Sequence, residues 1–301
     1  MAVATGVYLR SIEQHEETKL YMTPTREKEQ YPFADIELAR RLERTEAQGN
    51  VNFVEARAEA FPDVGAEWIE VAGAFGMFDG VGSPLTQTFG LGVSQPISAE
   101  ELDRLEQFFL SKGADVCHEV CPLVAMSLFE LFRGRGYQPA EVSNVLYRPI
   151  SPDLRLEAPR NESIKVRVIQ KDEVKLWTDT SFEGWSEFPE YADFFRELAQ
   201  VYGRAKGPSF IAELEGKPIA TGALTIHGDV ALLAGASTIP EARRQGAQLA
   251  LLEDRLRYSA EQGCTVAMMV ALPGSGSQRN AERHGFRIAY TRTRWQLPTS
   301  Q

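Results

Sequence analysis

The chain has little cysteine: three residues, Cys117, Cys121 and Cys264, among 301. A small and odd number of cysteines excludes a disulfide framework and is typical of a reducing compartment. Long apolar runs are also missing, and none approaches the roughly 20 residues that cross a bilayer. The N-terminal stretch soon becomes charged and contains no apolar core of a signal peptide. We therefore expect a cytoplasmic protein with no membrane partner.

Basic charge is in short supply as well. Lysine and arginine number 32 against 42 aspartates and glutamates, for a net charge of −10. A generic nucleic-acid surface needs clustered basic charge, so this balance excludes a nucleic-acid partner and mildly favours a cationic small molecule. Hydrophobic residues make up 43% and charged residues 25%, which excludes a mainly disordered chain.

The length is about twice that of a common domain, which predicts two domains. Residues 151–163 contain two prolines, five charges and no periodic apolar pattern, and strand-like segments lie on both sides at 142–150 and 164–169. We therefore predict an N-terminal arm at 1–34, a first domain at 35–150, a linker at 151–163 and a second domain at 164–301.

The two halves resemble each other in the order of their expected helices and strands and in the glycines that end the helices. In each half a helix closes at a glycine, Gly113 or Gly263, and leads to a strand and a short helix. Each short helix is followed by a glycine and an aromatic residue, at 136–137 and 285–286, and then by a final strand. This order favours an internal repeat of about 150 residues. The alternative is that the halves are two unrelated α/β units that share this order of helices and strands.

The periodicity predicts a mixed sheet flanked by helices, in the α/β or α+β class. Residues 35–61 are expected to form two helices, and a capping box at Ser98 is expected to open another. The second half is expected to form strands at 164–169, 209–215, 218–226, 230–237, 264–271 and 287–297, with helices within 171–204 and at 246–262 and 276–284.

The most informative segment is the one in which an apolar strand ends, a turn with Pro240 follows, and a basic loop enters the helix at 246–262. The first amides of a helix have no internal partner and lie at the positive end of the helix dipole. Arg243 and Arg244 add positive charge, and Gly246 allows the backbone to approach a ligand closely. These features predict an anion site suited to phosphate oxygens.

This loop resembles the acetyl-CoA pyrophosphate loop of the GCN5-related N-acetyltransferase (GNAT) superfamily, whose usual pattern is Gln/Arg-x-x-Gly-x-Gly/Ala. Arg243 and Gly246 match, whereas Gln248 stands where a small residue is usual. With the terminal Gly285-Phe286 unit, the resemblance covers roughly residues 163–297. It implies two acyl-CoA N-acyltransferase-like domains, each with a mixed, largely antiparallel sheet, and a first domain that has lost the loop. It also implies acetyl-CoA as acyl donor, bound by Ala236, Ser237, Thr238, Ile239, Arg243, Arg244, Gln245, Gly246, Ala247 and Gln248.

A second arginine–glycine segment, Arg133-Gly134-Arg135-Gly136, follows a helix instead of opening one. Its amides are therefore not arranged to hold phosphate, and we interpret it as a helix C-cap.

The resemblance also directs attention to an acid and a base. Ala281 stands where many members of the superfamily have the tyrosine that protonates the departing thiolate, so Tyr290 is the first candidate for the acid, with Ser275 or Ser277 as alternatives. Asn280, on a polar helix, is a candidate contact to the pantetheine or acetyl group, although a solvated helix is the alternative. The base candidates are Glu183 and Glu187, in the segment expected to form the acceptor wall, with Glu190, Glu213 and a relaying water as alternatives.

Cys117, His118 and Cys121 superficially suggest a metal site. Strand alternation places the two cysteines on one face and the histidine on the other, so we expect core packing and no metal.

The sequence thus predicts an acetyl-CoA-dependent N-acetyltransferase that acetylates a primary amine of a small molecule by direct attack on the thioester. Transfer of a longer acyl chain, transfer to a hydroxyl, a catalytically inactive acyl-CoA-binding or regulatory module, and a protein that binds no CoA remain alternatives. Homodimer formation is left open.

Overall fold

A computed structural model describes residues 31–154, 156, 160–186 and 192–298. Most of the predicted N-terminal arm, part of the predicted linker, and both Glu187 and Glu190 lie outside these residues. Within the described residues, no helix has the length and apolar character needed to cross a membrane.

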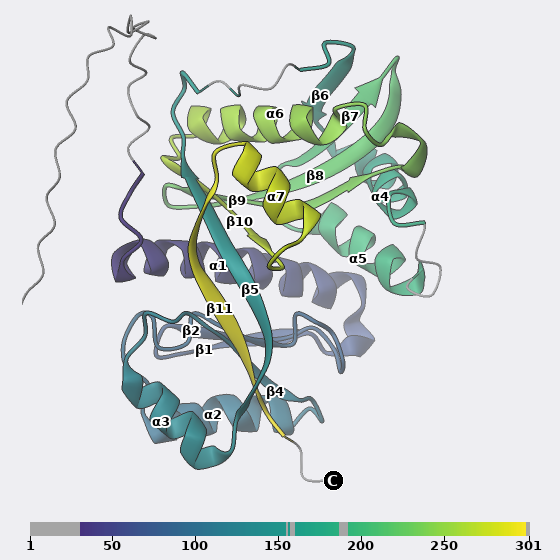
Figure 1. The fold of residues 1–301 in the computed structure, drawn as a ribbon. Helices are drawn as coiled ribbons and strands as arrows, with labels where there is room; N and C mark the ends of the chain where they lie inside the picture. The colour runs from purple at the N-terminus through teal and green to yellow at the C-terminus, as the bar shows by residue number, and fades with distance from the viewer. Residues whose placement is uncertain (1–30, 155, 157–159, 187–191, 299–301) are drawn as a thin grey trace, which may run out of the picture. The chain divides into compact units, whose positions relative to one another are not determined.

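The strands of the described residues form one eleven-stranded sheet in the order β1-β2-β3-β4-β11-β5-β10-β9-β8-β7-β6 (Figure 1). The pairs β3–β4 and β9–β10 are parallel and the other pairs are antiparallel, which confirms the predicted mixed, largely antiparallel sheet. The strands are β1 (Glu67–Val71), β2 (Ala74–Phe78), β3 (Gln87–Phe89), β4 (Val116–Val120), β5 (Gln138–Pro149), β6 (Ile164–Val168), β7 (Ser209–Leu214), β8 (Lys217–His227), β9 (Val230–Thr238), β10 (Val266–Ala271) and β11 (Arg287–Leu297).

Helices cover the two faces of this sheet. The helices are α1 (Ile36–Ala60), α2 (Ala99–Leu110), α3 (Met126–Arg135), α4 (Val174–Glu183), α5 (Ala192–Arg204), α6 (Ala247–Glu261) and α7 (Gly276–Arg283). On one face, α1 packs through Leu38 and Leu42 with Leu232 and Met268 of the sheet. On the other face, Ala250 and Leu251 of α6 pack with residues of opposite parity such as Leu233 and Ala267. The two faces thus follow the period-two alternation of the strands.

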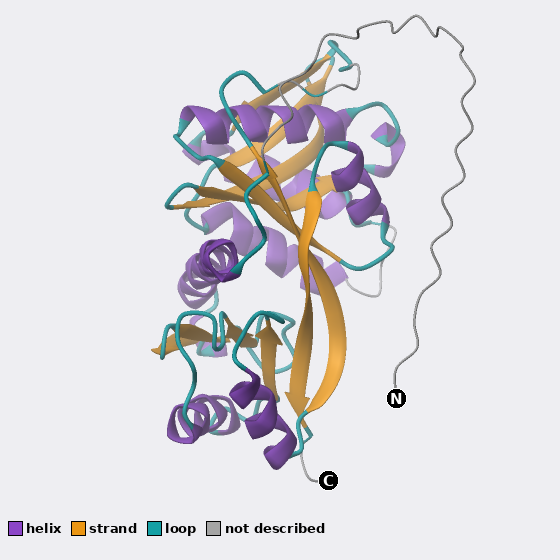
Figure 2. Ribbon diagram, turned by 60° about the vertical axis from the view of Figure 1, so that its left-hand side comes forward, coloured by secondary structure: helices purple, strands orange, loops and turns teal. Residues whose placement is uncertain are grey.

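The two halves exchange their final strands. β5, from the first half, lies between β10 and β11 of the second half, and β11 continues along β5 to pair with β4. Figure 2 shows β5 and β11 as a long twisted pair that links the two groups of strands. Both halves contain the order helix, strand, helix, strand, as α2-β4-α3-β5 and α6-β10-α7-β11. The division into domains at 150 and 164 stays a prediction, because the halves share one sheet.

Residues 36–60 form one helix, so the prediction of two helices within 35–61 was wrong. The helix continues through Gly49, although an interior glycine costs roughly 1 kcal/mol against alanine. The glycine has a packing role instead: a Cβ there would lie 3.2 Å from Thr225 Oγ1 and 3.4 Å from Leu232 Cδ2. Because glycine has no Cβ, α1 can lie close against β8 and β9 at this position.

The candidate metal ligands, on β4 and at the residue that follows it, lie in the core. His118 is fully buried, its Nε2 lies 2.9 Å from the hydroxyl of Tyr137, and its ring stacks on Phe132. Cys117 and Cys121 are buried. In the described part of the chain, no group of histidine, cysteine and acidic residues could hold a metal ion.

Candidate functional site

The candidate site begins where β9 leaves β10. The two strands run parallel and pair from Val230 with Val266 to Leu232 with Met268, and the pairing ends there. β9 continues to Thr238 along β8, while β10 continues to Ala271 along β5. Within the described residues, no strand pairs with these two edges beyond Leu232 and Met268, so their backbone groups can bind an extended ligand, apart from carbonyls of β9 that side chains of the protein already occupy.

An irregularity in β9 reshapes this edge. The register with β8 shifts between Thr221 and Ala223, opposite Gly235, whose φ is +58°. A side chain at Gly235 would crowd its neighbours, because a Cβ would lie 3.1 Å from the Cβ of Ala223 and 3.5 Å from the ring of Tyr202. The glycine therefore permits a bulge, which re-aims the backbone groups that follow it.

Arg255 of α6 holds the bulge from the opposite face. Its Nη1 donates to the carbonyl oxygens of Ala223 and Ala234, at 3.2 Å each, and its Nε donates to Leu251. The side chain is buried, and burial lowers the pKa of its guanidinium to about 10, which still leaves it charged at neutral pH. Sequence reasoning missed this residue, although an arginine within a leucine-rich helix was a detectable signal.

The predicted phosphate loop has the expected backbone. α6 begins at Ala247, its N-cap Gly246 has φ +97°, and no side chain caps the helix. Arg244 also has a positive φ, +62°, and its side chain is exposed together with that of Gln245. The uncapped amides at the start of α6 and the adjacent guanidinium form a surface suited to an anion.

Two residues that were predicted to bind the cofactor have side chains that bind other parts of the protein instead. Arg243 donates to the carbonyl oxygens of Thr238 and Gly184, at 3.3 and 3.1 Å. Gln248 donates from its amide nitrogen to the carbonyl of Ser237, at 3.2 Å, and to the hydroxyl of Thr238, at 2.7 Å. Both side chains fasten the loop to the end of β9, so they shape the loop and leave Arg244 as its outward cation.

The C-terminal end of α4 packs against the end of β9, where Arg243 and Gln248 also bind. A Cβ at Gly184 would lie only 2.7 Å from the Cβ and Oγ of Ser237 and 3.1 Å from the backbone nitrogen of Thr238. Ser237 is buried, and its hydroxyl bonds to the carbonyl of Ser181 and to the hydroxyl of Thr221. The predicted backbone segment is thus fixed by α4, with Ala236 exposed and Ile239 partly exposed.

Of the predicted catalytic residues, Glu183 lies beside the loop, because it precedes Gly184, whose carbonyl accepts from Arg243. Glu183 ends α4 and is exposed, Asn280 is exposed on α7, and Glu187 lies outside the described residues. Ser275, an alternative acid, is the N-cap of α7. Tyr290 lies on the face of the sheet that packs against α1, opposite to α6. Their catalytic roles stay predictions.

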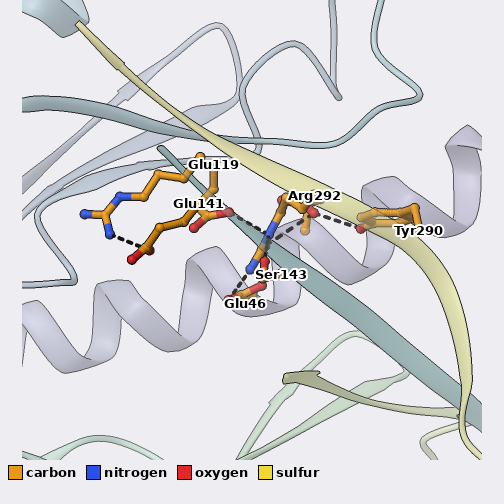
Figure 3. A network of polar contacts seen from close by, with 8 residues as sticks. Glu46, Glu119, Glu141, Ser143, Tyr290 and Arg292 are labelled. Atoms are coloured by element: carbon orange, nitrogen blue, oxygen red, sulfur yellow. Dashed lines mark hydrogen bonds and ion pairs between the residues drawn. The ribbon is translucent and has the colours of Figure 1, made fainter. Parts of the chain in front are cut away.

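Tyr290 belongs to a buried polar network (Figure 3). Its hydroxyl donates to Glu43 at 2.8 Å, and Arg292, two residues along β11, pairs with Glu43, Glu46 and Glu119. Burial raises the pKa of Glu43 and Glu119, and burial beside Glu43 raises the pKa of Tyr290 well above its ordinary value. The network thus contains three carboxyl groups and one guanidinium, and burial favours the neutral form of two of the carboxyls.

Comparison with known proteins identifies the segment that carries this geometry. Residues 171–286 match the model of the acetyltransferase (GNAT) family. No curated protein matched the sequence. A solved GCN5-related N-acetyltransferase from Kribbella flavida is 17% identical, with a TM-score of 0.57 over 82% of this chain and 95% of that one. A GCN5-related N-acetyltransferase from Sphaerobacter thermophilus is 15% identical, with a TM-score of 0.50 over 71% of this chain and 73% of that one.

The structural likenesses show a shared fold, and the family match covers the strand separation, the loop and helices α4 to α7. Residues 171–286 are therefore the part of the chain that matches the acetyltransferase (GNAT) family.

Proposed function

We propose that the protein is an acetyl-CoA-dependent N-acetyltransferase that acetylates a primary amine of a small molecule. The observation that carries this proposal is the separation of β9 from β10 directly before the uncapped N-terminus of α6. A narrow arm with amide groups fits between two strands with free edges, and a pyrophosphate fits at a helix N-terminus with an exposed arginine. The arm and the pyrophosphate of the donor would therefore bind to adjacent elements, the arm between β9 and β10 and the pyrophosphate at the start of α6.

The donor supplies an acyl group held as a thioester. The chain would hold its pyrophosphate with the amides of Ala247 and Gln248 and with the Arg244 side chain. The backbone of β9 from Ala236 to Thr238, which no strand pairs with on the side of β10, would align the arm, and backbone amides of this segment would polarise the acyl carbonyl. Arg255 and Gly184 act indirectly, because they fix the shape of that edge.

A proton must leave the attacking amine, and the thiolate must gain one. Glu183 is exposed at the end of α4, so it is available to a water that relays the amine's proton. Tyr290 is the proposed acid for the thiolate and carries its proton at neutral pH, although its raised pKa and its hydrogen bond to Glu43 make it a weaker acid than an ordinary tyrosine. Direct attack without a covalent enzyme intermediate fits the burial of all three cysteines.

A second candidate function is an acyl-CoA-binding module without turnover. Ala281 stands where the superfamily usually has a tyrosine that acts as the acid, and it is buried at 1% exposure. The hydroxyl of Tyr290 already donates its proton to a hydrogen bond with Glu43. Acyl donors longer than acetyl also remain within the proposal, as do a cytoplasmic location and a homodimer.

The proposal is tested by calorimetric titration with CoA and by thiol release from acetyl-CoA over a panel of primary amines. Arg244→Glu is expected to weaken CoA binding about tenfold or more, because reversing one charge beside a phosphate costs at least a typical charged contact. Arg133→Glu is the matched control, since it reverses an exposed charge in the arginine–glycine segment at the end of α3.

Turnover of an amine, together with a selective loss in Arg244→Glu, supports the enzyme. CoA binding without thiol release over the whole panel supports the binding module. Equal affinities in the two charge-reversal variants, or no heat with CoA, contradict the proposed site.

A further inference from the structure

A cavity of about 40 Å³ lies between α1, α5 and the sheet. It is lined by residues of α1, of β8 and β9, and of the segment that leads from α5 into β7. None of the sequence motifs and none of the proposed donor-binding residues falls in this cavity. Its walls are largely apolar and carry a few polar side chains, which is the usual composition of a small-molecule site.

Four polar side chains line the cavity, and each comes from a different element: Asn50 of α1, Tyr202 of α5, Ser209 of β7 and Thr225 of β8. Within the described residues, none of these four side chains makes a hydrogen bond. None of them is among the unpaired polar atoms that this part of the chain buries completely, so each keeps surface that a ligand can reach. A ligand that bonds to such groups recovers the free energy that leaving them unpaired costs.

The strand register places the polar groups of the sheet on the face that α1 covers. Ser209 lies opposite Ala223, and Thr225 lies opposite Leu232, which packs against α1. Residues directly opposite each other on paired strands project to the same face, and so do residues two apart on one strand. The hydroxyls of β7 and β8 therefore face the same space as the side chains of α1 and α5.

The cavity reaches the place where β9 leaves β10. Leu232 is the last residue of β9 that pairs with β10, and both it and Ala234 line the cavity. Tyr202 also borders the bulge, since its ring lies 3.5 Å from the position of a Cβ on Gly235. α6, whose N-terminus is proposed to bind the pyrophosphate, packs on the opposite face. A ligand in the cavity therefore approaches the strand separation from the face that the pyrophosphate does not occupy.

The charges at the cavity favour a neutral ligand group. Of the described residues that line it, Lys206 alone is charged, and it pairs with Glu55 at 2.8 Å through a side chain that is 76% exposed. The lining thus has no carboxylate for a second ammonium and no unpaired cation for an acidic group. Burial raises the pKa of Tyr202, so its hydroxyl keeps its proton. Hydroxyl and amide groups both donate and accept, and a ligand hydroxyl does the same.

The volume limits the length of the group that enters. A bound water needs roughly 10–15 Å³ of this kind of space, so a cavity of about 40 Å³ holds about three non-hydrogen atoms. A chain of two carbons that ends in a hydroxyl has this size.

We propose that this cavity binds a hydroxyl group at the distal end of the acceptor, so that the preferred acceptor is a short amino alcohol. The inference rests on the proposed function for the reacting amine, but the binding of the hydroxyl is measured without turnover. The ligand hydroxyl exchanges hydrogen bonds with Tyr202 and Thr225. Its carbon atoms lie against Leu232 and Ala234.

The experiment compares 3-amino-1-propanol with n-butylamine, which has a methyl group in place of the hydroxyl and the same number of non-hydrogen atoms. Binding of each amine is measured by calorimetry with and without saturating CoA, and turnover is measured by thiol release from acetyl-CoA. The amino alcohol is expected to bind about tenfold more tightly and to have a correspondingly lower KM, because the methyl group leaves the polar side chains unpaired.

The variants remove one hydroxyl at a time. Tyr202→Phe and Thr225→Val are each expected to reduce the preference for the amino alcohol about threefold or more, through KM and the calorimetric Kd. Thr225→Ser retains a hydroxyl at the same position and is expected to retain the preference. Tyr258→Phe removes the hydroxyl of a tyrosine on α6 that packs on Phe210 outside the cavity, and is the matched control for Tyr202→Phe.

Equal affinity of the wild type for the two amines, or no binding of either, overturns the inference, even if both amines are acetylated and the proposed function stands. A preference that Tyr202→Phe and Thr225→Val leave intact overturns it as well. A preference that depends on these two side chains, without any thiol release, supports the inference while counting against the enzyme. Thermal unfolding of each variant confirms that it is folded.

Discussion

Arg292 on the last strand binds Glu46 on the first helix through both terminal nitrogens, at 2.6 and 3.0 Å. The two residues are 246 positions apart, and the same guanidinium also pairs with Glu43 and Glu119. The exchanged strand β11 is thereby fastened to α1 and β4. This network fixes the first helix against the face of the sheet that Leu232 of β9 and Met268 of β10 also line.

Arg292→Met is expected to lower the free energy of unfolding by about 3–5 kcal/mol, because it leaves three carboxylates buried without their cation. Urea unfolding measures the loss. Lys175→Met removes an ion pair with Asp179 whose side chains are 85% and 62% exposed, and is expected to change stability by less than about 1 kcal/mol. Similar losses in both variants would contradict a buried role for the network.

The buried arginine beneath β9 is expected to control donor binding. Arg255→Met removes the donors to the carbonyls of Ala223 and Ala234, so the bulge relaxes and CoA affinity falls about tenfold, with a loss of roughly 1–3 kcal/mol in stability. Arg257→Met, two residues along the same helix, removes a half-exposed arginine and is the matched control. Calorimetry with CoA and thermal unfolding give the two readouts. Unchanged CoA affinity in Arg255→Met would show that the bulge does not position the donor.

Most of the second half could be predicted from its sequence. The predicted strand at 287–297 has the observed bounds, and the helix predicted at 246–262 forms at 247–261. These elements follow from local periodicity and from glycines at their ends. Gly216, between β7 and β8, has the positive φ of a tight turn.

The exchange of β5 and β11 could not be predicted in the same way, because strand pairing depends on residues far apart in the chain. The same limit applies to the site. The loop at 243–248 was visible as a local pattern, but the inward turn of Arg243 depends on Gly184, 59 residues earlier. Glu43 carries no local signal of its role, since burial and partners decide what its charge does.

The close approach of α4 to β9 predicts a specific sensitivity at Gly184. Gly184→Ala would place a Cβ within 2.7 Å of Ser237, so α4 or β9 must shift, at a cost of roughly 1–3 kcal/mol. Because Ser237 lies on the donor edge, CoA affinity is expected to fall as well. Gly134→Ala, in α3, has open space around its Cβ and is expected to stabilise the protein by about 0.5–1 kcal/mol. If both variants behave alike, the contact between Gly184 and Ser237 does not constrain the edge.

The last prediction concerns the stability of the folded protein at low pH. Tyr137 donates its hydroxyl proton to Glu106, so His118 donates from Nε2 to Tyr137, and its buried Nδ1 has no hydrogen-bond partner. Burial lowers the pKa of His118 from 6.5 to about 3, so the unfolded chain binds this proton more readily than the folded one. The contribution to stability is fully present above pH 6.5 and is lost as the pH falls toward 3, by at most about 1.4 kcal/mol per pH unit.

Glu43 and Glu119 act in the opposite direction, because a carboxyl with a raised pKa stabilises the folded state below its unfolded pKa and loses that contribution as the pH rises. Their effect is common to the wild type and to His118→Gln, whose amide can still donate to Tyr137. Urea unfolding of both proteins between about pH 7 and pH 4 therefore isolates the imidazole. The variant is expected to lose less stability toward low pH than the wild type. Parallel curves would show that His118 takes up its proton in the folded protein as readily as in the unfolded one.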